Sequence, residues 1–275
     1  MSLVSRARAA GVADREQVLA LLAMDPVESV PVSSWLSRSG VERGLRSGNV
    51  WLHGDSLCFS GANLLPVNMD ADAARAFADL ALRQGRRCSS IVGRLPATAD
   101  LWRMLEPRWG PARAVRQRQF VMVTRQDAPI APDPMVRHAQ AEDLEEFFTA
   151  SVEMYTEEIG ASPIAHDGGS SYRYRIAQLI RDGFAFVRVE DGRVIFKAEL
   201  GAVSGGCAQL QGVWVHPDRR GEGIGSAATA AVLRLARSAG MTTVSLAVND
   251  FNIAAVRSYL RCGFEVLGAQ MVVLF

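Results

Sequence analysis

Three glycines at alternating positions, Gly221, Gly223 and Gly225, separate a strand-like segment from a helix-like segment rich in alanine, leucine and valine. Glycine adopts backbone angles that a Cβ atom forbids, and it lets a ligand lie close against the main chain. If the helix begins inside these glycines, its unpaired N–H groups and the positive end of its dipole face the turn, which suits an anion. Arg220 adds a permanent positive charge beside them. The segment therefore predicts a phosphate-binding loop.

The residues of this turn argue against two common kinds of phosphate loop. A P-loop closes a longer glycine loop with Gly-Lys-Ser/Thr, and the turn has no lysine. A dinucleotide fingerprint has the spacing Gly-x-Gly-x-x-Gly with an acid about 20 residues further on, and the glycines here are spaced differently. The turn instead follows a Val-x-Val-x-Pro strand, residues 213–217, and reads Arg-Gly-Glu-Gly-Ile-Gly over residues 220–225.

This arrangement resembles the Arg/Gln-x-x-Gly-x-Gly/Ala signature of the GNAT acetyltransferase superfamily. A second segment is similar to the family's downstream motif, Asn-x-x-Ala-x-x-x-Tyr before Gly-Phe, and is formed here by Asn252, Ala255 and Tyr259. Asn252 and Tyr259 lie on one face of a helix because their spacing is about two helical turns. The resemblance covers about residues 135–275. It implies an α/β (α+β) fold with a mixed, mostly antiparallel central sheet, acetyl-CoA as co-substrate and no metal.

The resemblance also implies which residues bind the cofactor. The amides of the turn would cradle the pyrophosphate of coenzyme A, and the preceding strand would pair with the pantetheine amides like an additional strand. A backbone N–H of that strand would polarise the thioester oxygen. The positions implied are Val213, Trp214, Val215, Arg220, Gly221, Glu222, Gly223, Ile224, Gly225, Ser226, Asn252 and Ala255.

Tyr259 is the candidate general acid. Because an unperturbed tyrosine titrates near about pH 10, it holds a proton at neutral pH that it can give to the departing thiolate. The alternative interpretation is a core aromatic residue, since Val256 and Leu260 beside it suggest a packed helix face.

A general base is harder to assign. Deprotonating a lysine acceptor at pH 7 costs about 4 kcal/mol, whereas deprotonating an α-amine costs only about 1 kcal/mol. Many relatives supply a glutamate or histidine from the strand before the turn, where this chain has Gln209 and Gln211 on one face. Glu199 is the candidate substitute. It can equally pair with Lys197 on the same face or point into water.

The acceptor is a small-molecule amine or a protein amine, which Glu157, Glu158 and Gln211 would bind. A solvated helix end is the alternative for the two glutamates. The function predicted is acetyl transfer from the thioester to a primary amine by direct attack in a ternary complex. Two alternatives stay open: a non-catalytic acyl-CoA-binding regulatory module, and transfer of a longer acyl group.

Composition limits the remaining possibilities. With 30 basic and 29 acidic residues the net charge is +1, which does not suggest a nucleic-acid partner. We find no apolar run long enough to span a bilayer and no signal-peptide pattern, so we expect a cytoplasmic protein without a membrane partner. The four cysteines are far apart, which argues against a zinc site or a disulfide scaffold. The oligomeric state is not specified.

The length of 275 residues favours two domains. Periodicity predicts, for the first, helices at 14–23, 70–84 and 98–105, one or two helices over 32–47 interrupted by Gly40 and Gly44, a hairpin at 50–61, and strands at 88–92 and 119–123. It ends at residue 126 and is followed by a proline-rich linker over residues 127–134. This N-terminal domain, residues 1–126, is either a degenerate GNAT-like unit in tandem with the second or an unrelated regulatory or dimerisation domain.

The second domain, residues 135–275, is predicted to be catalytic. Strands are expected at 136–138, 184–189, 194–203, 209–215 and 244–248, followed by two closing strands near 264–267 and 271–274. Helices are expected at 142–158 and 172–181, after the glycine turn, and at 252–262. Their order is that of a GNAT domain.

Overall fold

The computed structural model describes residues 6–160, 162–164 and 167–275. The first half of the chain contains β1 (Arg8–Ala9), α1 (Arg15–Met24), α2 (Pro26–Ser39), α3 (Val41–Arg46), β2 (Val50–His53), β3 (Ser56–Ser60), β4 (Asn63–Val67), α4 (Ala71–Gln84), β5 (Ser90–Arg94), α5 (Ala97–Trp109) and β6 (Ala114–Thr124). The second half contains β7 (Arg137–His138), α6 (Leu144–Ile159), α7 (Ser170–Arg181), β8 (Ala185–Glu190), β9 (Arg193–Ser204), β10 (Cys207–Val215), α8 (Ile224–Ser238), β11 (Thr243–Asn249), α9 (Ile253–Arg261) and β12 (Glu265–Leu274). Apart from the short α3, the two halves repeat one order of helices and strands.

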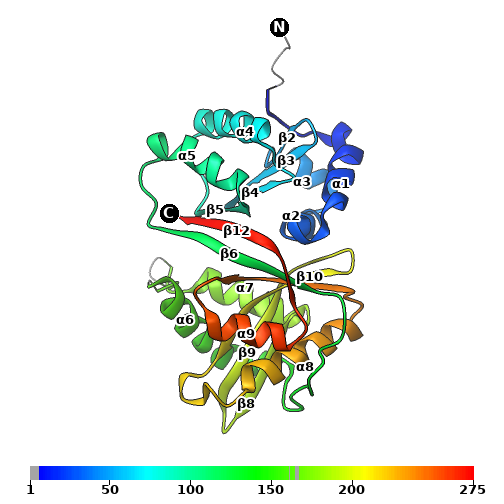
Figure 1. Ribbon diagram of the computed structural model, residues 1–275, viewed down its shortest axis with the longest axis vertical. Helices are drawn as coiled ribbons and strands as arrows, with labels where there is room; N and C mark the ends of the chain where they lie inside the picture. The colour runs from blue at the N-terminus through cyan, green and yellow to red at the C-terminus, as the bar shows by residue number, and fades with distance from the viewer. Residues whose placement is uncertain (1–5, 161, 165–166) are drawn as a thin grey trace.

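The strands of the described residues form one twelve-stranded sheet in the order β1-β2-β3-β4-β5-β12-β6-β11-β10-β9-β8-β7. The last strand of each half lies against the other half: β12 pairs with β5, and β6 pairs with β11. The two exchanged strands also pair with each other, antiparallel, at the centre of the sheet. Figure 1 shows them crossing the middle of the molecule, between the helices of the two halves. Two pairs of neighbouring strands are parallel, β4 with β5 and β10 with β11, and the rest are antiparallel, as the predicted mixed sheet requires.

Helices cover both faces of the second half of the sheet. On one face, α8 packs its small apolar residues, including Ala228 and Val232, against β10 and β11. On the other face, α6 and α7 share a core with β8 and β9 around Phe147. Helix α2 of the first half also packs on β9 and β10, with Val27 and Val30 beside Ala202 and Cys207.

The segment between β6 and β7 runs against the second half. Ala128 and Ile130 of this segment pack on the core around α8. Asp133 is buried, its N–H donates to the carbonyl of Ala227 at 2.9 Å, and its carboxylate binds Arg188 at 2.7 Å. The division into domains at residues 126 and 135 stays a prediction, and two strands of the sheet cross it.

Most elements lie where periodicity predicts them, but the two-residue strand β1 was not predicted, and three further corrections concern longer elements. Helix α2 starts at Pro26 instead of residue 32: Asp25 caps its first N–H groups, and a proline in the first turn needs no N–H partner. Strand β4 was missed because a proline inside a short run argues against a strand. The two closing strands are one strand, β12, whose pairing with β6 slips near Gly268 without ending.

Two features are absent from the residues that the structure describes, a helix suited to cross a membrane and a metal-binding cluster. None of their helices combines the length and hydropathy needed to cross a bilayer. Their histidine, cysteine and acidic side chains form no group of three or more that is suited to hold a metal ion. The four cysteines are free and buried.

Candidate active site

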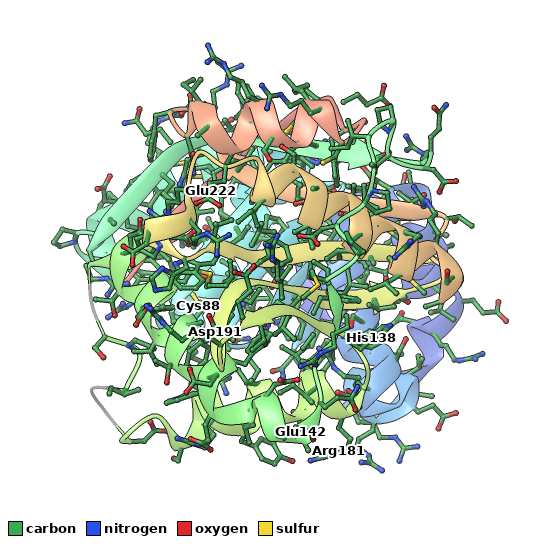
Figure 2. The ribbon with its side chains drawn as sticks, turned by 90° about the horizontal axis from the view of Figure 1, so that it is seen from below. Cys88, His138, Glu142, Arg181, Asp191 and Glu222 are labelled. Atoms are coloured by element: carbon green, nitrogen blue, oxygen red, sulfur yellow. The ribbon has the colours of Figure 1, made fainter. Side chains whose placement is uncertain are left out.

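The glycine turn joins β10 to α8 and leaves the start of that helix open. Gly221 and Gly223 have φ angles of +86° and +83°, in the left-handed region that favours glycine. Gly223 is the N-cap residue of α8, and no side chain caps the helix. Its first N–H groups therefore face the turn together with the positive end of the helix dipole. The Nε of Arg219 donates to both carboxylate oxygens of Glu222, at 3.0 and 2.9 Å, and Figure 2 labels this glutamate.

The strands beside this turn diverge. Strands β10 and β11 pair only between residues 207–209 and 243–245. Beyond that point β11 continues beside β6, whereas the rest of β10 loses its neighbour on that side. Between Gln211 and Trp214 the pairing of β10 with β9 also slips, and Gly212 has a φ angle of +58°, which makes a β-bulge. The result is an unpaired strand edge leading to the glycine turn, suited to pair with an extended ligand.

The main chain of this edge is available, but one of its side chains is not. The side chain of Trp214 is buried in the core beneath α6 and α7. At the other end of the gap, Ser226 and Ser258 hold α8 and α9 together through a 2.7 Å hydrogen bond between their hydroxyl oxygens. Asn252 caps α9 by accepting from the N–H of Ala255 at 3.2 Å. Contacts of Ser226, Asn252 and Ala255 with the cofactor stay predictions.

Arg220 links the turn to Glu157 of α6, a residue predicted to bind the acceptor. Its two terminal nitrogens each donate to Glu157 at 2.7 Å, and its Nε donates to the carbonyl of Val215 at 3.1 Å. This pair lowers the pKa of Glu157, mainly through the hydrogen bonds from Arg220. The end of α6 is thereby fastened to the start of the glycine turn.

Tyr259 is 8% exposed and lies in the core of the second half, edge-on to Phe264 with ring centroids 5.8 Å apart. Burial raises the pKa of its phenol, and the carboxylate of Glu158 raises it further. The side chain is therefore both a core aromatic residue and a phenol that keeps its proton at neutral pH. The backbone carbonyl of Glu158 accepts from Arg116 of β6 at 3.2 Å, so an exchanged strand contacts this corner of the site.

Glu199 is paired with Arg175 of α7 at 3.4 Å, an ion pair that the sequence did not predict. Lys197, which shares its face of β9, turns to the bulge instead and donates to the carbonyl of Gly212 at 3.1 Å. Sequence reasoning treated Lys197 only as a partner for Glu199. The signal that was available is composition, since Lys197 is the single lysine of the chain beside 29 arginines.

Neutral amides line the same face of the sheet. Gln211 lies over Gly201 and donates to Gln209 at 2.5 Å. Across the gap, Gln119 of β6 donates to Asn249 of β11 and accepts from Gln270 of β12, both at 3.0 Å. The surface contributed by β10, β11 and the exchanged strands is thus polar and uncharged at these positions.

Two family models match the chain. Residues 142–264 match the Acetyltransferase (GNAT) family, and residues 48–147 match a domain of unknown function (DUF4081). The first match contains the glycine turn, Glu158 and Tyr259. Residues 142–264 are a GNAT domain.

Solved structures extend the fold similarity beyond the GNAT domain. A GNAT-family acetyltransferase from Colwellia psychrerythraea is 15% identical, with a TM-score of 0.54 over 94% of this chain and 97% of that one. A GCN5-related N-acetyltransferase from Sphaerobacter thermophilus is 16% identical, with a TM-score of 0.61 over 99% of this chain and 95% of that one. Both halves therefore share a fold with these proteins. No protein with a curated description matches the sequence.

The first half presents a different surface at the positions equivalent to the GNAT site. The turn between β4 and α4 contains Asn68, Met69 and Asp70 and no glycine. Asp70 caps α4 by accepting from the N–H of Ala73 at 2.7 Å. Pro66 of β4 lies so close to Gly93 of β5 that a Cβ there would be 2.7 Å from the proline ring. An acidic cap and a close contact between the strands stand where the GNAT domain has free amides and an open strand edge.

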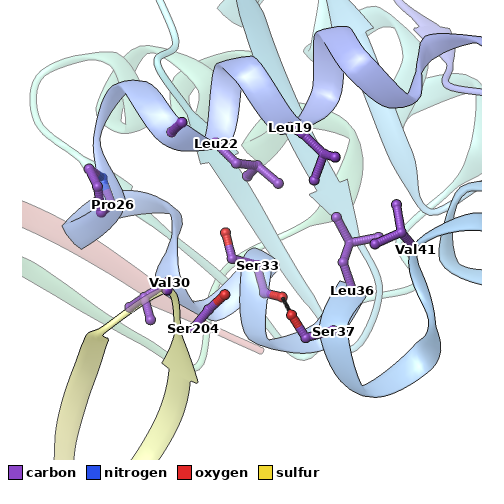
Figure 3. Close-up of a pocket in the computed structure, with 11 residues that line it drawn as sticks. Leu19, Leu22, Pro26, Val30, Ser33, Leu36, Ser37, Val41 and Ser204 are labelled. Atoms are coloured by element: carbon purple, nitrogen blue, oxygen red, sulfur yellow. Dashed lines mark hydrogen bonds between the residues drawn. The ribbon is translucent and has the colours of Figure 1, made fainter. Parts of the chain in front are cut away.

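A separate apolar pocket of about 270 Å³ lies away from the glycine turn. Figure 3 shows that Leu19 and Leu22 of α1, Val30 and Ser33 of α2, and Ser204 at the end of β9 line it. It lies between the helices of the first half and the hairpin of β9 and β10. The residues around it offer no titratable side chain for acyl transfer.

Proposed function

We propose that this protein is an acetyl-CoA-dependent N-acetyltransferase that moves the acetyl group to a primary amine by direct attack in a ternary complex. The observation that supports it best is the uncapped start of α8 at the end of the unpaired edge of β10. An uncapped helix start takes phosphate groups, and a free strand edge takes an extended chain with amide groups. Coenzyme A has both parts, and it supplies the thioester.

In this mechanism the protein binds, polarises and transfers protons. The amides of the turn and Arg220 hold the pyrophosphate. A backbone N–H of the bulge stabilises the negative charge that develops on the thioester oxygen when the amine nitrogen attacks the carbonyl carbon. The carbon–sulfur bond then breaks, and Tyr259 gives its proton to the thiolate. The proton released by the amine returns through solvent to the phenolate.

The acceptor is a primary amine that needs little help to lose its proton. Glu199 is held by Arg175, and the amides of Gln209 and Gln211 cannot act as bases. Glu158, whose charge raises the pKa of Tyr259, is the carboxylate suited to attract an ammonium group. An α-amine or a similarly weak base fits this site better than a lysine side chain, which pays about 3 kcal/mol more to become neutral at pH 7.

The test measures acetyl-CoA binding by calorimetry and thiol release across a panel of small amines and amino-terminal peptides. We expect binding, thiol release that requires an amine, and an acetylated product by mass spectrometry. Tight binding without product from any acceptor would point to an acyl-CoA-binding regulatory module instead. Preference for a longer acyl-CoA in the same assay would move the proposal to another acyl group. If the protein does not bind acetyl-CoA, the proposed function is wrong.

A further inference from the structure

Lys197 is the only lysine in a chain that carries 29 arginines, and its side chain is 1% exposed. Removing an ammonium group from water is costly unless the protein returns hydrogen bonds or charge. A buried lysine in an otherwise arginine-only chain therefore requires a local reason. Its surroundings lie beside the proposed acyl-transfer site.

The Nζ atom of Lys197 is directed at the bulge of β10. It donates to the carbonyl oxygen of Gly212 at 3.1 Å and lies 5.2 Å from the centre of the Phe147 ring. Glu199, two residues away, is engaged by Arg175. Burial lowers the pKa of Lys197 to about 8, against opposing effects of Glu199 and Glu158 and with a small contribution from Arg175.

The carbonyl that Lys197 holds belongs to the peptide between Gly212 and Val213. In a trans peptide the C=O and N–H groups point in opposite directions. Since the carbonyl of Gly212 points to the ammonium group of Lys197, the N–H of Val213 points away from that group. Within the bulge Val213 has no residue opposite it on β9, and β11 leaves the other edge of β10 unpaired there.

The available space favours lysine over arginine. A Cβ on Gly212 would lie 3.0 Å from Nζ and 3.3 Å from the side chain of Glu199. The ammonium group is compact, whereas a guanidinium is a wide planar fork that stays charged at any working pH. The φ angle of +58° and this close approach both favour glycine at residue 212.

We infer that Lys197 is a positioning residue that fixes the Gly212–Val213 peptide, so that the Val213 N–H is aimed at the oxygen of a thioester lying along β10. This inference rests on the proposed function, because it concerns the amide that would polarise the acyl carbonyl. In addition to the main-chain contact itself, it assigns to the side chain of Lys197 the role of setting the direction of the Val213 N–H. Lys197 itself touches neither substrate.

The test compares the wild type with Lys197→Met and Lys197→Arg. Methionine keeps the length and apolar contacts of the side chain and removes the donor, and arginine keeps a donor in a larger group. The infrared carbonyl band of bound acetyl-CoA labelled with ¹³C at the carbonyl reports polarisation without an acceptor. We expect this band to lie at lower wavenumber in the wild type than in Lys197→Met. We expect kcat to fall about tenfold to a hundredfold with the acetyl-CoA Kd unchanged, because a misaimed amide loses part of what a deleted oxyanion donor loses.

Different results would refute the positioning role of Lys197 and the proposed function. An unchanged carbonyl band and unchanged kcat in Lys197→Met would refute the positioning role and leave the proposed function intact. No acetyl-CoA binding by the wild type would refute the proposed function and the inference with it. A wild-type melting temperature for Lys197→Met separates positioning from folding. If that variant unfolds, a Lys197→Arg band at higher wavenumber than the wild type's is the supporting result, and a band equal to the wild type's is the opposing one.

The single lysine also permits a direct probe. Labelling with ¹⁵N-lysine places one Nζ signal in the whole protein. We expect this signal to shift when acetyl-CoA binds, since the peptide that it holds would then donate to the thioester. A signal that does not change on saturation with acetyl-CoA would contradict the inference.

Discussion

Arg220 is already engaged by a carboxylate where a pyrophosphate would bind. Its pair with Glu157 is bidentate, but both side chains are partly open to water, at 43% and 51% exposure. Such pairs contribute up to about 1 kcal/mol, so a pyrophosphate can displace Glu157 without a large loss. Under the proposed function this competition would couple cofactor and acceptor binding, because Glu157 would become available to an acceptor when Arg220 binds the cofactor.

Glu157→Gln tests this competition. The change removes one negative charge, which both competes for Arg220 and repels the pyrophosphate. We therefore expect acetyl-CoA to bind about twofold to fivefold more tightly. Calorimetry at two salt concentrations measures it, and the gain should shrink at the higher one. Glu153→Gln, a substitution at an exposed position of the same helix, is the matched control. Weaker binding by Glu157→Gln would contradict the competition.

Tyr259→Phe isolates one oxygen atom. The ring, its burial and its contact with Phe264 remain, so folding and acetyl-CoA affinity should be unchanged. We expect kcat to fall by about 100-fold to 10,000-fold, which is the usual contribution of a general acid. Because burial raises the pKa of this phenol, its proton stays bound through pH 10, and the wild-type rate should not fall below that pH through loss of this proton. Thiol release against pH measures both. An undiminished kcat would remove Tyr259 from the mechanism.

At the scale of elements, α4 and α8 occupy equivalent places in the two halves but begin differently. Asp70 closes the start of α4, whereas Gly223 leaves the start of α8 open. A carboxylate at a helix N-terminus satisfies the same N–H groups that a phosphate would use. In the proposed function, this difference at the helix start favours pyrophosphate binding by the second half of the chain.

Gly223→Asp would place on α8 the kind of residue that caps α4. We expect acetyl-CoA binding to be lost, because a fixed negative charge then faces the pyrophosphate. Gly223→Asn is the matched control: it has the same shape and the same cost of a φ angle of +83°, but no charge. Calorimetry should show a binding loss at least tenfold larger for aspartate than for asparagine. Equal losses would mean that backbone strain, not charge, is responsible.

Local signals explain what the sequence predicted well. The glycine turn, the hairpin after Val50 and the helix after Asp70 depend on residues close together in the chain, where turn chemistry and capping act. Lys197 was not foreseen because its role depends on a bulge in the neighbouring strand. The pairing of Glu199 with Arg175 was missed for the same reason, since it joins a strand to a helix 24 residues earlier.

Strand exchange was the least predictable feature of the whole molecule. An apolar strand near the end of each half fits equally well beside its own half or the other, because the alternation of its side chains is satisfied in both places. Polar side chains favour the exchanged arrangement of the strands. Those that lie in register across β5, β12, β6 and β11 are Arg94, Gln270, Gln119 and Asn249. Gln119 is buried, and its amide is satisfied only when strands from both halves meet.

This exchange predicts that the two predicted domains do not fold independently. A fragment of residues 1–126 would lack β12 beside β5, and a fragment of residues 135–275 would lack β6 beside β11. Each would expose an unpaired edge in what is the middle of the sheet, a surface that favours aggregation. We expect both to be unstable or aggregated alone, and to form a complex that binds acetyl-CoA when they are expressed together.

The fragment of residues 114–275 is the matched control, because it restores β6 between β11 and β12 and adds only 21 residues to the shorter fragment. It keeps the whole proposed site, but it leaves the β5-facing edge of β12 unpaired and loses α2, which packs on β9 and β10 through Val27 and Val30. We therefore expect it to fold, to bind acetyl-CoA, and to melt at a lower temperature than the full chain. Size-exclusion chromatography, melting curves and calorimetry on the three fragments measure these expectations. A soluble, folded fragment of residues 135–275 with full acetyl-CoA affinity would show that β6 is dispensable, and the exchanged strands would then connect two self-sufficient halves instead of completing them.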